Sequence, residues 1–133
     1  MRSITTNSIM IGRVIFELLS RDLELKKLVG DKVFPVVIQE DVEFPYVVYR
    51  RSRLVPSYTK DNYATDDTVY VDVVAVAEDY MSSLNLAQAI RCALEGKKVQ
   101  YDDIDIINIE LEDSQEDGED VFVQGLTFKI NCR

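Results

Sequence analysis

The apolar residues of this chain change their spacing along its length, and this change limits the folds that the chain can adopt. Residues 7–19 and 78–94 place apolar side chains three or four positions apart, which is typical of one buried helix face. Other segments carry runs of β-branched and aromatic residues whose alternate side chains point to opposite faces of a strand. These expected strands are 32–38, 45–55, 68–77, 104–112 and 121–132.

The amino-terminal region predicts a helix, a break and a shorter helix. The apolar stripe of the first helix consists of Ile11, Val14, Ile15, Leu18 and Leu19. Asn7 or Ser8 can cap its start, and Ser20 offers the start of a second helix over 23–29. Gly30 suits the position after the last turn, because glycine enters the left-handed region without strain. The second main helix, 78–94, has Ser82 or Ser83 as its expected cap and Leu86, Ala89, Ile90, Ala93 and Leu94 as its buried stripe.

Three of the remaining segments carry information about strand position. In 68–77 both alternating sets are largely apolar, with Asp72 as the exception, which predicts a central strand covered on both sides for much of its length. Pro35 interrupts the first strand, which indicates an edge or a strand end. The polar segments 57–67 and 113–120 are expected to be an exposed loop and a long acidic hairpin loop. Residues 97–103 are expected to form a linker.

The order of elements sets the fold class. It is helix, short helix, three strands, helix and two strands, with no repeated strand–helix–strand unit joined by glycine-rich turns. The sequence therefore predicts an α+β fold: a mostly antiparallel five-stranded sheet with two main helices packed on one face. A length of 133 residues fits one domain, so residues 1–133 are expected to form a single unit.

Composition narrows the classes of function. The net charge is −9, which disfavours broad binding of nucleic-acid phosphates, and the absence of histidine removes the commonest general base and metal ligand. No apolar run is long enough for a membrane span and no signal-peptide pattern opens the chain, so a soluble protein is expected. Cys92 lies in a helical apolar pattern and Cys132 near the end of the chain; both are interpreted as reduced thiols of an intracellular protein, Cys92 as a small core residue.

No segment carries a recognisable catalytic, cofactor or metal motif. The stretch 113–118 resembles the start of a calcium loop, but the twelfth position is Gln124 where such a loop needs a bidentate glutamate. The acidic run 102–105 is interpreted as a solvated strand entrance. We therefore expect no catalytic residue, no cofactor and no metal.

The arginines at positions 50, 51 and 53 differ from the acidic sequence around them. Strict alternation places Arg51 and Arg53 on one face of the strand and Arg50 on the other. Arginine and tyrosine are enriched in interface hot spots, although charge at an exposed strand end can also serve only to prevent edge pairing. A contact with nucleic acid is disfavoured by the neighbouring carboxylates. The expected protein-interface residues are Arg50, Arg51, Arg53, Tyr58, Tyr63, Asp66, Asp67, Glu116 and Asp117.

A set of short motifs in a fixed order resembles a known family. The motifs are GDKVFP at 30–35, FPYVVY at 44–49, VDVVA at 71–75 and ALEG at 93–96, followed by a closing pair of strands. This order resembles the tail completion, or tail terminator, proteins of long non-contractile-tailed bacteriophages and prophages, which are related in fold to the minor tail protein U of phage lambda. The resemblance covers residues 8–131.

The resemblance implies a structural role without catalysis or a cofactor. Such proteins form a ring, usually of six copies, at the head-proximal end of the tail tube, where the ring ends tube polymerisation and joins the tail to the head connector. The implied partners are further copies of the chain, the tube protein and the connector protein, while DNA passes through the bore without specific binding. The implied location is the virion, and the bacterial host cytoplasm during assembly. The segments 57–67 and 113–120 are the expected docking loops.

Two other classes of function stay open on the residues alone. One is a small α+β module that binds a ligand or dimerises in a regulatory complex, which would need an apolar pocket with a few convergent polar groups. The other is an enzyme that uses one of the unassigned carboxylates, which would need paired acidic groups in a cleft.

Overall fold

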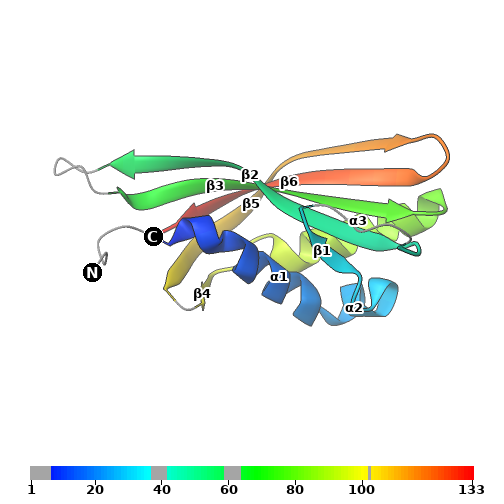
Figure 1. Ribbon diagram of the computed structural model, residues 1–133, viewed down its shortest axis with the longest axis horizontal. Helices are drawn as coiled ribbons and strands as arrows, with labels where there is room; N and C mark the ends of the chain where they lie inside the picture. The colour runs from blue at the N-terminus through cyan, green and yellow to red at the C-terminus, as the bar shows by residue number, and fades with distance from the viewer. Residues whose placement is uncertain (1–6, 37–41, 59–63, 102) are drawn as a thin grey trace.

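A computed structural model describes residues 7–36, 42–58, 64–101 and 103–133 (Figure 1). A short 3-10 helix, η1 (Ser8–Met10), leads into the first α-helices. In chain order the remaining elements are α1 (Ile11–Arg21), α2 (Leu23–Val29), β1 (Val33–Pro35), β2 (Tyr46–Tyr58), β3 (Ala64–Ala77), α3 (Tyr80–Leu94), β4 (Val99–Tyr101), β5 (Ile104–Gly118) and β6 (Phe122–Cys132).

The strands form one six-stranded mixed sheet in the order β1-β2-β3-β6-β5-β4. β1 runs parallel to β2, and the other neighbouring pairs are antiparallel. The broad α+β class is confirmed, but the prediction of a mostly antiparallel five-stranded sheet is wrong. The additional strand is β4, which lies in the expected linker 97–103 and pairs Val99 with Ile106. A three-residue strand is too short to show a period of two in its sequence. β4 is a strand because it pairs with β5, which its own residues do not indicate.

The three α-helices lie on one side of the sheet, as Figure 1 shows. We call this helix-covered side the inner face and the opposite side the outer face. α3 packs against β3 and β6, and α1 packs against β1 and β2. Buried residues on the inner face include Val47, Val71, Val73, Leu126, Phe128 and Ile130. They meet the predicted helical stripes, of which Ile11, Val14, Ile15, Leu19, Leu86, Ala89, Ile90, Ala93 and Leu94 are buried.

Aspartates cap α2 and α3 where the sequence suggested serines, whereas the expected cap at the start of the first helix is wrong, since Asn7 makes no side-chain cap to η1 and α1 follows η1 directly. The backbone N–H of Leu25 donates to the Asp22 carboxylate at 3.0 Å, so α1 continues through Ser20 and α2 is capped by Asp22. At α3 the backbone N–H of Ser82 donates to Asp79 at 2.8 Å. An ionised carboxylate is favoured over a hydroxyl at these positions because it also interacts with the positive end of the helix dipole. Gly30, with φ of 63°, ends α2 as predicted.

The described parts of both expected loops are mainly strand. β2 continues to Tyr58 and β3 begins at Ala64, while residues 59–63 lie outside the described residues. β5 continues to Gly118, which leaves only 119–121 as the turn into β6. These segments are polar because neither face of the strand is buried along most of their described length, and apolar residues alternate only where one face is buried. The sequence therefore indicated loops. The hairpin ends instead rely on the backbone ladder, for example between Asp117 and Val123.

The two cysteines occupy opposite environments. Cys92 is exposed on α3, so its interpretation as a core residue is wrong: the stripe through Ala89 and Ala93 faces the sheet, and Cys92 lies beside it. Cys132 is buried on the inner face of β6. Both thiols are free. No helix among the described residues combines the length and hydropathy that a membrane crossing requires.

Candidate protein-interaction surface

A β-bulge at Ser52 changes how the three arginines are arranged. Arg50 pairs with Asp72, Arg51 with Val71 and Arg53 with Tyr70, so the register shifts by one residue between Arg51 and Arg53. Val71 belongs to the buried inner face, so Arg51 lies on the inner face, whereas Arg50 and Arg53 share the outer face. The expectation that Arg51 and Arg53 share a face is therefore wrong, because an extra residue inverts the alternation beyond it.

All three arginine side chains are exposed, and two of them make specific contacts. Arg51 Nη1 donates to the backbone oxygen of Ile9 at 3.2 Å, which connects β2 to the start of the first helix. The Arg53 guanidinium lies 5.6 Å from the centroid of the Tyr70 ring, in cation–π range. These contacts orient two cationic groups toward different sides of the same strand.

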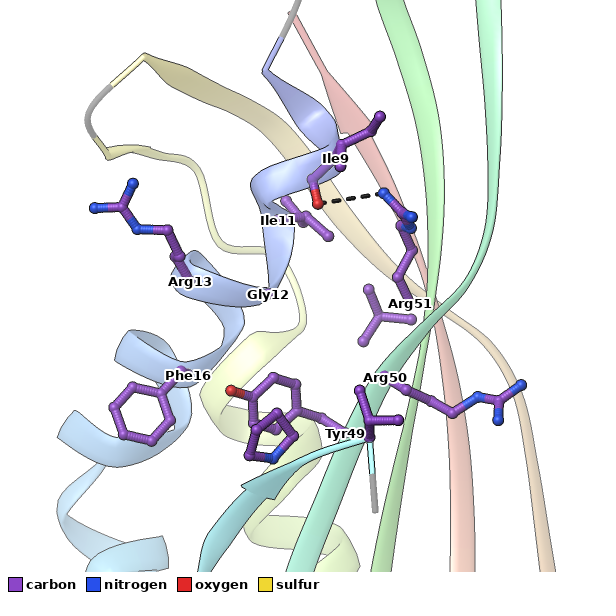
Figure 2. Close-up of a pocket in the computed structure, with 11 residues that line it drawn as sticks. Ile9, Ile11, Gly12, Arg13, Phe16, Tyr49, Arg50 and Arg51 are labelled. Carbon is purple, nitrogen blue, oxygen red and sulfur yellow. Dashed lines mark hydrogen bonds between the residues drawn. The ribbon is translucent and has the colours of Figure 1, made fainter.

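A groove of about 560 Å³ lies between α1 and β2, next to Arg51 (Figure 2). Its buried wall includes Ile11, Tyr49 and Val71. Its mouth carries exposed apolar side chains, with Ile9 exposed by 69% and Val36 by 59%. Single exposed apolar side chains are ordinary, but a contiguous group of them rimmed by polar residues marks a contact surface, and here Ile9 and Val36 line the same groove as Arg51.

Aromatic packing defines the lower part of the groove. The rings of Phe16 and Tyr49 are tilted at 42° with their centroids 6.4 Å apart. Burial raises the pKa of the Tyr49 hydroxyl above its usual 10.0, so this group stays neutral at physiological pH. Figure 2 shows Arg51 directed toward Ile9, while Arg50 and Arg13 point away from the groove. An apolar side chain accompanied by a carboxylate would match this combination of surfaces.

A second candidate region is acidic and lies on the hairpin formed by β5 and β6. Glu116 and Asp117 are both exposed on β5. The Tyr80 hydroxyl donates to both carboxylate oxygens of Glu116, at 3.1 and 3.3 Å, and Gln124 Nε2 donates to one of them at 3.0 Å. The hydrogen bond to Glu116 raises the pKa of Tyr80. The Glu116 carboxylate is therefore held in place at the surface.

The remaining predicted interface residues do not form one site. Tyr58, exposed by 65%, lies at the end of β2, and Asp66 is exposed on β3. Asp67, in contrast, is 5% exposed, and its carboxylate accepts a hydrogen bond from the hydroxyl of Ser8. The expectation that Asp67 lies in an exposed loop is wrong, because β3 begins at Ala64 and turns Asp67 inward. Tyr63 lies outside the described residues.

The groove is the feature that sequence reasoning missed. Ile9 and Phe16 are apolar but do not belong to the helical stripe that predicted α1. Apolar residues outside the buried stripe were the sequence signal that could have indicated the groove. The calcium-like stretch 113–118 lies within β5, and no group of three or more acidic, cysteine or histidine residues in the described chain is arranged to hold a metal ion.

Comparisons with known proteins place this fold in a class. Residues 13–129 match the family described as "Tail completion protein gp17". A chain from the solved structure described as "Virion of native gene transfer agent (GTA) particle" has the same fold, with a TM-score of 0.78 over 89% of this chain and 90% of that chain, at 16% sequence identity. None of the curated proteins matches the sequence significantly.

Because the family match spans most of the sequence, the chain belongs to the tail completion protein gp17 family. It is a structural phage-tail protein of the virion and not an enzyme.

Proposed function

We propose that this chain ends the phage tail tube by forming a ring at its head-proximal end. The ring, usually of six copies in the family that it resembles, stops addition of tube subunits and offers its other side to the head connector. The single observation that carries this proposal is the family match over residues 13–129. The protein assembles in the bacterial host cytoplasm and remains in the virion.

Two surfaces of different chemistry support a role between unlike neighbours. The groove presents exposed apolar groups such as Ile9 and Val36, while the hairpin carries the carboxylates of Glu116 and Asp117. A subunit that uses different surfaces toward different neighbours forms heterologous contacts, which close into rings when the rotation divides the circle. We assign the groove to contact with the tube or connector protein.

The charge of the chain suits the passage of DNA. Six copies at −9 would carry about −54 in total. Phosphates are repelled by a bore of the same sign, so DNA passes without specific binding.

The test uses the tail-tube protein encoded by the same phage or prophage. Purified tube protein is polymerised with and without this chain, and tube lengths are measured by electron microscopy. We expect capped, shorter tubes with a ring at one end. Tubes that elongate as if the chain were absent, with no association by co-sedimentation, would contradict the proposal.

The groove is tested by a matched pair of variants. Ile9→Asp places a carboxylate at the mouth of the groove, and Leu23→Asp places one on α2 at a similarly exposed apolar residue, 76% exposed, that does not line the groove. Ile9→Asp should weaken binding to tubes or to the connector at least tenfold. Leu23→Asp should bind like the wild type.

A further inference from the structure

Within the described residues, the sheet leaves part of its hydrogen-bonding edge unpaired on both sides. β1 pairs only with Val47–Tyr49 of β2, so among the described residues 50–58 are paired with β3 alone. β4 pairs only with Ile104–Ile106 of β5, and the N–H of Gly96 donates to the oxygen of Ile109 at 2.8 Å. Residues 110–118 are therefore paired with β6 alone within the same described part. We call 50–58 the basic edge and 110–118 the acidic edge.

The two edges carry opposite charges. The basic edge contains Arg50, Arg51 and Arg53 and no acidic residue, and the acidic edge contains Glu110, Glu112, Asp113, Glu116 and Asp117 and no basic residue. Charges on a free edge ordinarily prevent pairing with another copy. Here they repel only like edges, which excludes two-fold pairing, while a basic edge attracts the acidic edge of a second copy.

We propose that copies of this chain join head to tail by pairing the basic edge of one copy with the acidic edge of the next, which extends the sheet from subunit to subunit. This inference rests on the proposed ring. β2 and β5 run antiparallel within one sheet, and rotation about an axis along the strands preserves strand direction. The new contact is therefore antiparallel and forms a regular ladder.

The register of the contact between copies follows from which residues are paired across neighbouring strands of one copy. Arg50 of β2 pairs with Asp72 of β3, which pairs with Thr127 of β6, which in turn pairs with Asp113 of β5. Sliding the next copy by four residues aligns the two free edges and places Arg50 opposite Asp117. The same shift places Arg51 opposite Glu116.

Side-chain directions agree with that register. Asp117 pairs with Val123 on the outer face, which Arg50 also occupies. Glu116 pairs with the buried Gln124 of the inner face, which Arg51 also occupies. Both charge pairs therefore lie on matching faces, as directly opposed residues must.

The four-residue shift between neighbouring copies is also compatible with closure of a ring. Four residues correspond to about 13 Å along a strand, and each copy adds the four strands β2, β3, β6 and β5, which advances the sheet by about 19 Å to the same strand of the next copy. The resulting strand tilt of about 35° lies at the lower end of the range found in closed barrels.

Charge exchange between the edges tests the contact. The first variant carries Arg50→Glu and Arg51→Glu, and the second carries Glu116→Arg and Asp117→Arg. Each variant alone opposes like charges and should show at least tenfold weaker self-association by sedimentation velocity over a concentration series. An equimolar mixture restores both contacts in alternation and should assemble like the wild type. Lys26→Glu with Lys27→Glu, two exposed charges on α2, is the control. Circular dichroism and thermal melting establish that each variant is folded.

Cysteine cross-linking tests the register in a Cys92→Ser background. Arg50→Cys with Asp117→Cys should give a ladder of covalent oligomers under mild oxidation, with or without tail-tube protein. Lys26→Cys with Asp117→Cys should not. The inference would be overturned if either charge-exchanged variant alone assembles like the wild type, or if the mixture of folded variants fails to assemble. It would also be overturned if the Arg50→Cys, Asp117→Cys ladder is absent both with and without tube protein. Tube capping by the wild type is measured separately, so an intact capping activity with failed edge pairing leaves the proposed function standing.

Discussion

Two neighbouring valines on β3 show how differently the faces of the sheet are used. Val73 is fully buried under the helices, whereas Val74, the next residue, points to the outer face and is half-exposed. Tyr70 and Asp72 on the outer face are also half-exposed. The prediction that β3 is covered on both sides for much of its length is therefore wrong at Tyr70 and Val74, whereas Asp72 was its stated exception. Apolar sequence on both faces shows what a strand can bury, and only the packing of helices decides which face is buried.

The largest effect is expected at the centre of the inner face. Phe128 is fully buried on β6, and Phe128→Ala removes an aromatic ring from this core. We expect a loss of about 3–5 kcal/mol in the free energy of unfolding, since the transfer and cavity contributions add. Urea denaturation measures it. A loss below about 1 kcal/mol would show that the core relaxes around the cavity.

The two valines give a direct comparison of the faces. Val73→Ala should lower the free energy of unfolding by about 2 kcal/mol, and Val74→Ala by less than about 1 kcal/mol, because the second side chain is already partly in water. Both variants keep the same strand and the same chemical change. Equal losses in the isolated protein would mean that the outer face is covered as fully as the inner one.

A cap at the edge of the helical layer has a smaller expected effect. Asp22→Ala removes the acceptor for the Leu25 N–H at the start of α2, which costs about 1 kcal/mol in a typical helix. Asp31→Ala removes an exposed carboxylate just after the end of α2 and serves as the control. Thermal unfolding of both variants should give a lower midpoint for Asp22→Ala only.

The exposed arginines should contribute least to stability. Replacing Arg50, Arg51 and Arg53 together with glutamate is expected to change the free energy of unfolding by less than about 1 kcal/mol, because exposed charges interact weakly. The same triple variant should lose contacts between copies or with the tube. An unfolded triple variant would show that these side chains support the fold.

The cysteines extend the comparison to alkaline pH. Burial, with the charges of Asp67 and Asp105, raises the pKa of Cys132 to about 12 from its usual 9.0. A thiol whose folded pKa is raised keeps its proton in the folded state, so stability falls as pH rises from about 9 toward 12. Iodoacetamide at pH 8 should modify the exposed Cys92 quickly and Cys132 only on unfolding, as mass spectrometry can measure. A Cys132→Ser variant should lose the alkaline part of the dependence.

Much of the fold could be predicted because its core is periodic. The stripe of α1 and the alternation of β6 through Gln124, Leu126 and Phe128 follow from burial of one face, and the stop at Gly30 follows from the positive φ that glycine adopts without strain. The hairpin ends of β2 and β5 were missed because they are strands with little burial, and β4 because it is three residues long.

The candidate surface was predictable in composition and not in arrangement. The sequence identified the arginines at 50, 51 and 53 and the carboxylates of Glu116 and Asp117. Their faces depend on the bulge at Ser52, whose hydroxyl donates to the oxygen of Tyr70, and a one-residue bulge leaves no periodic signal. The groove depends on the approach of α1 to β2, which joins residues distant in the chain.

Local spacing of apolar and polar residues was sufficient to determine the α+β class, the buried helix stripes and the opposite charges of two separate segments. Only the tertiary structure decided that those segments are the two free edges of one sheet, because strand order and register arise from hydrogen bonds between distant residues. The same long-range pairing turned Asp67 inward and left Ile9 exposed beside Arg51.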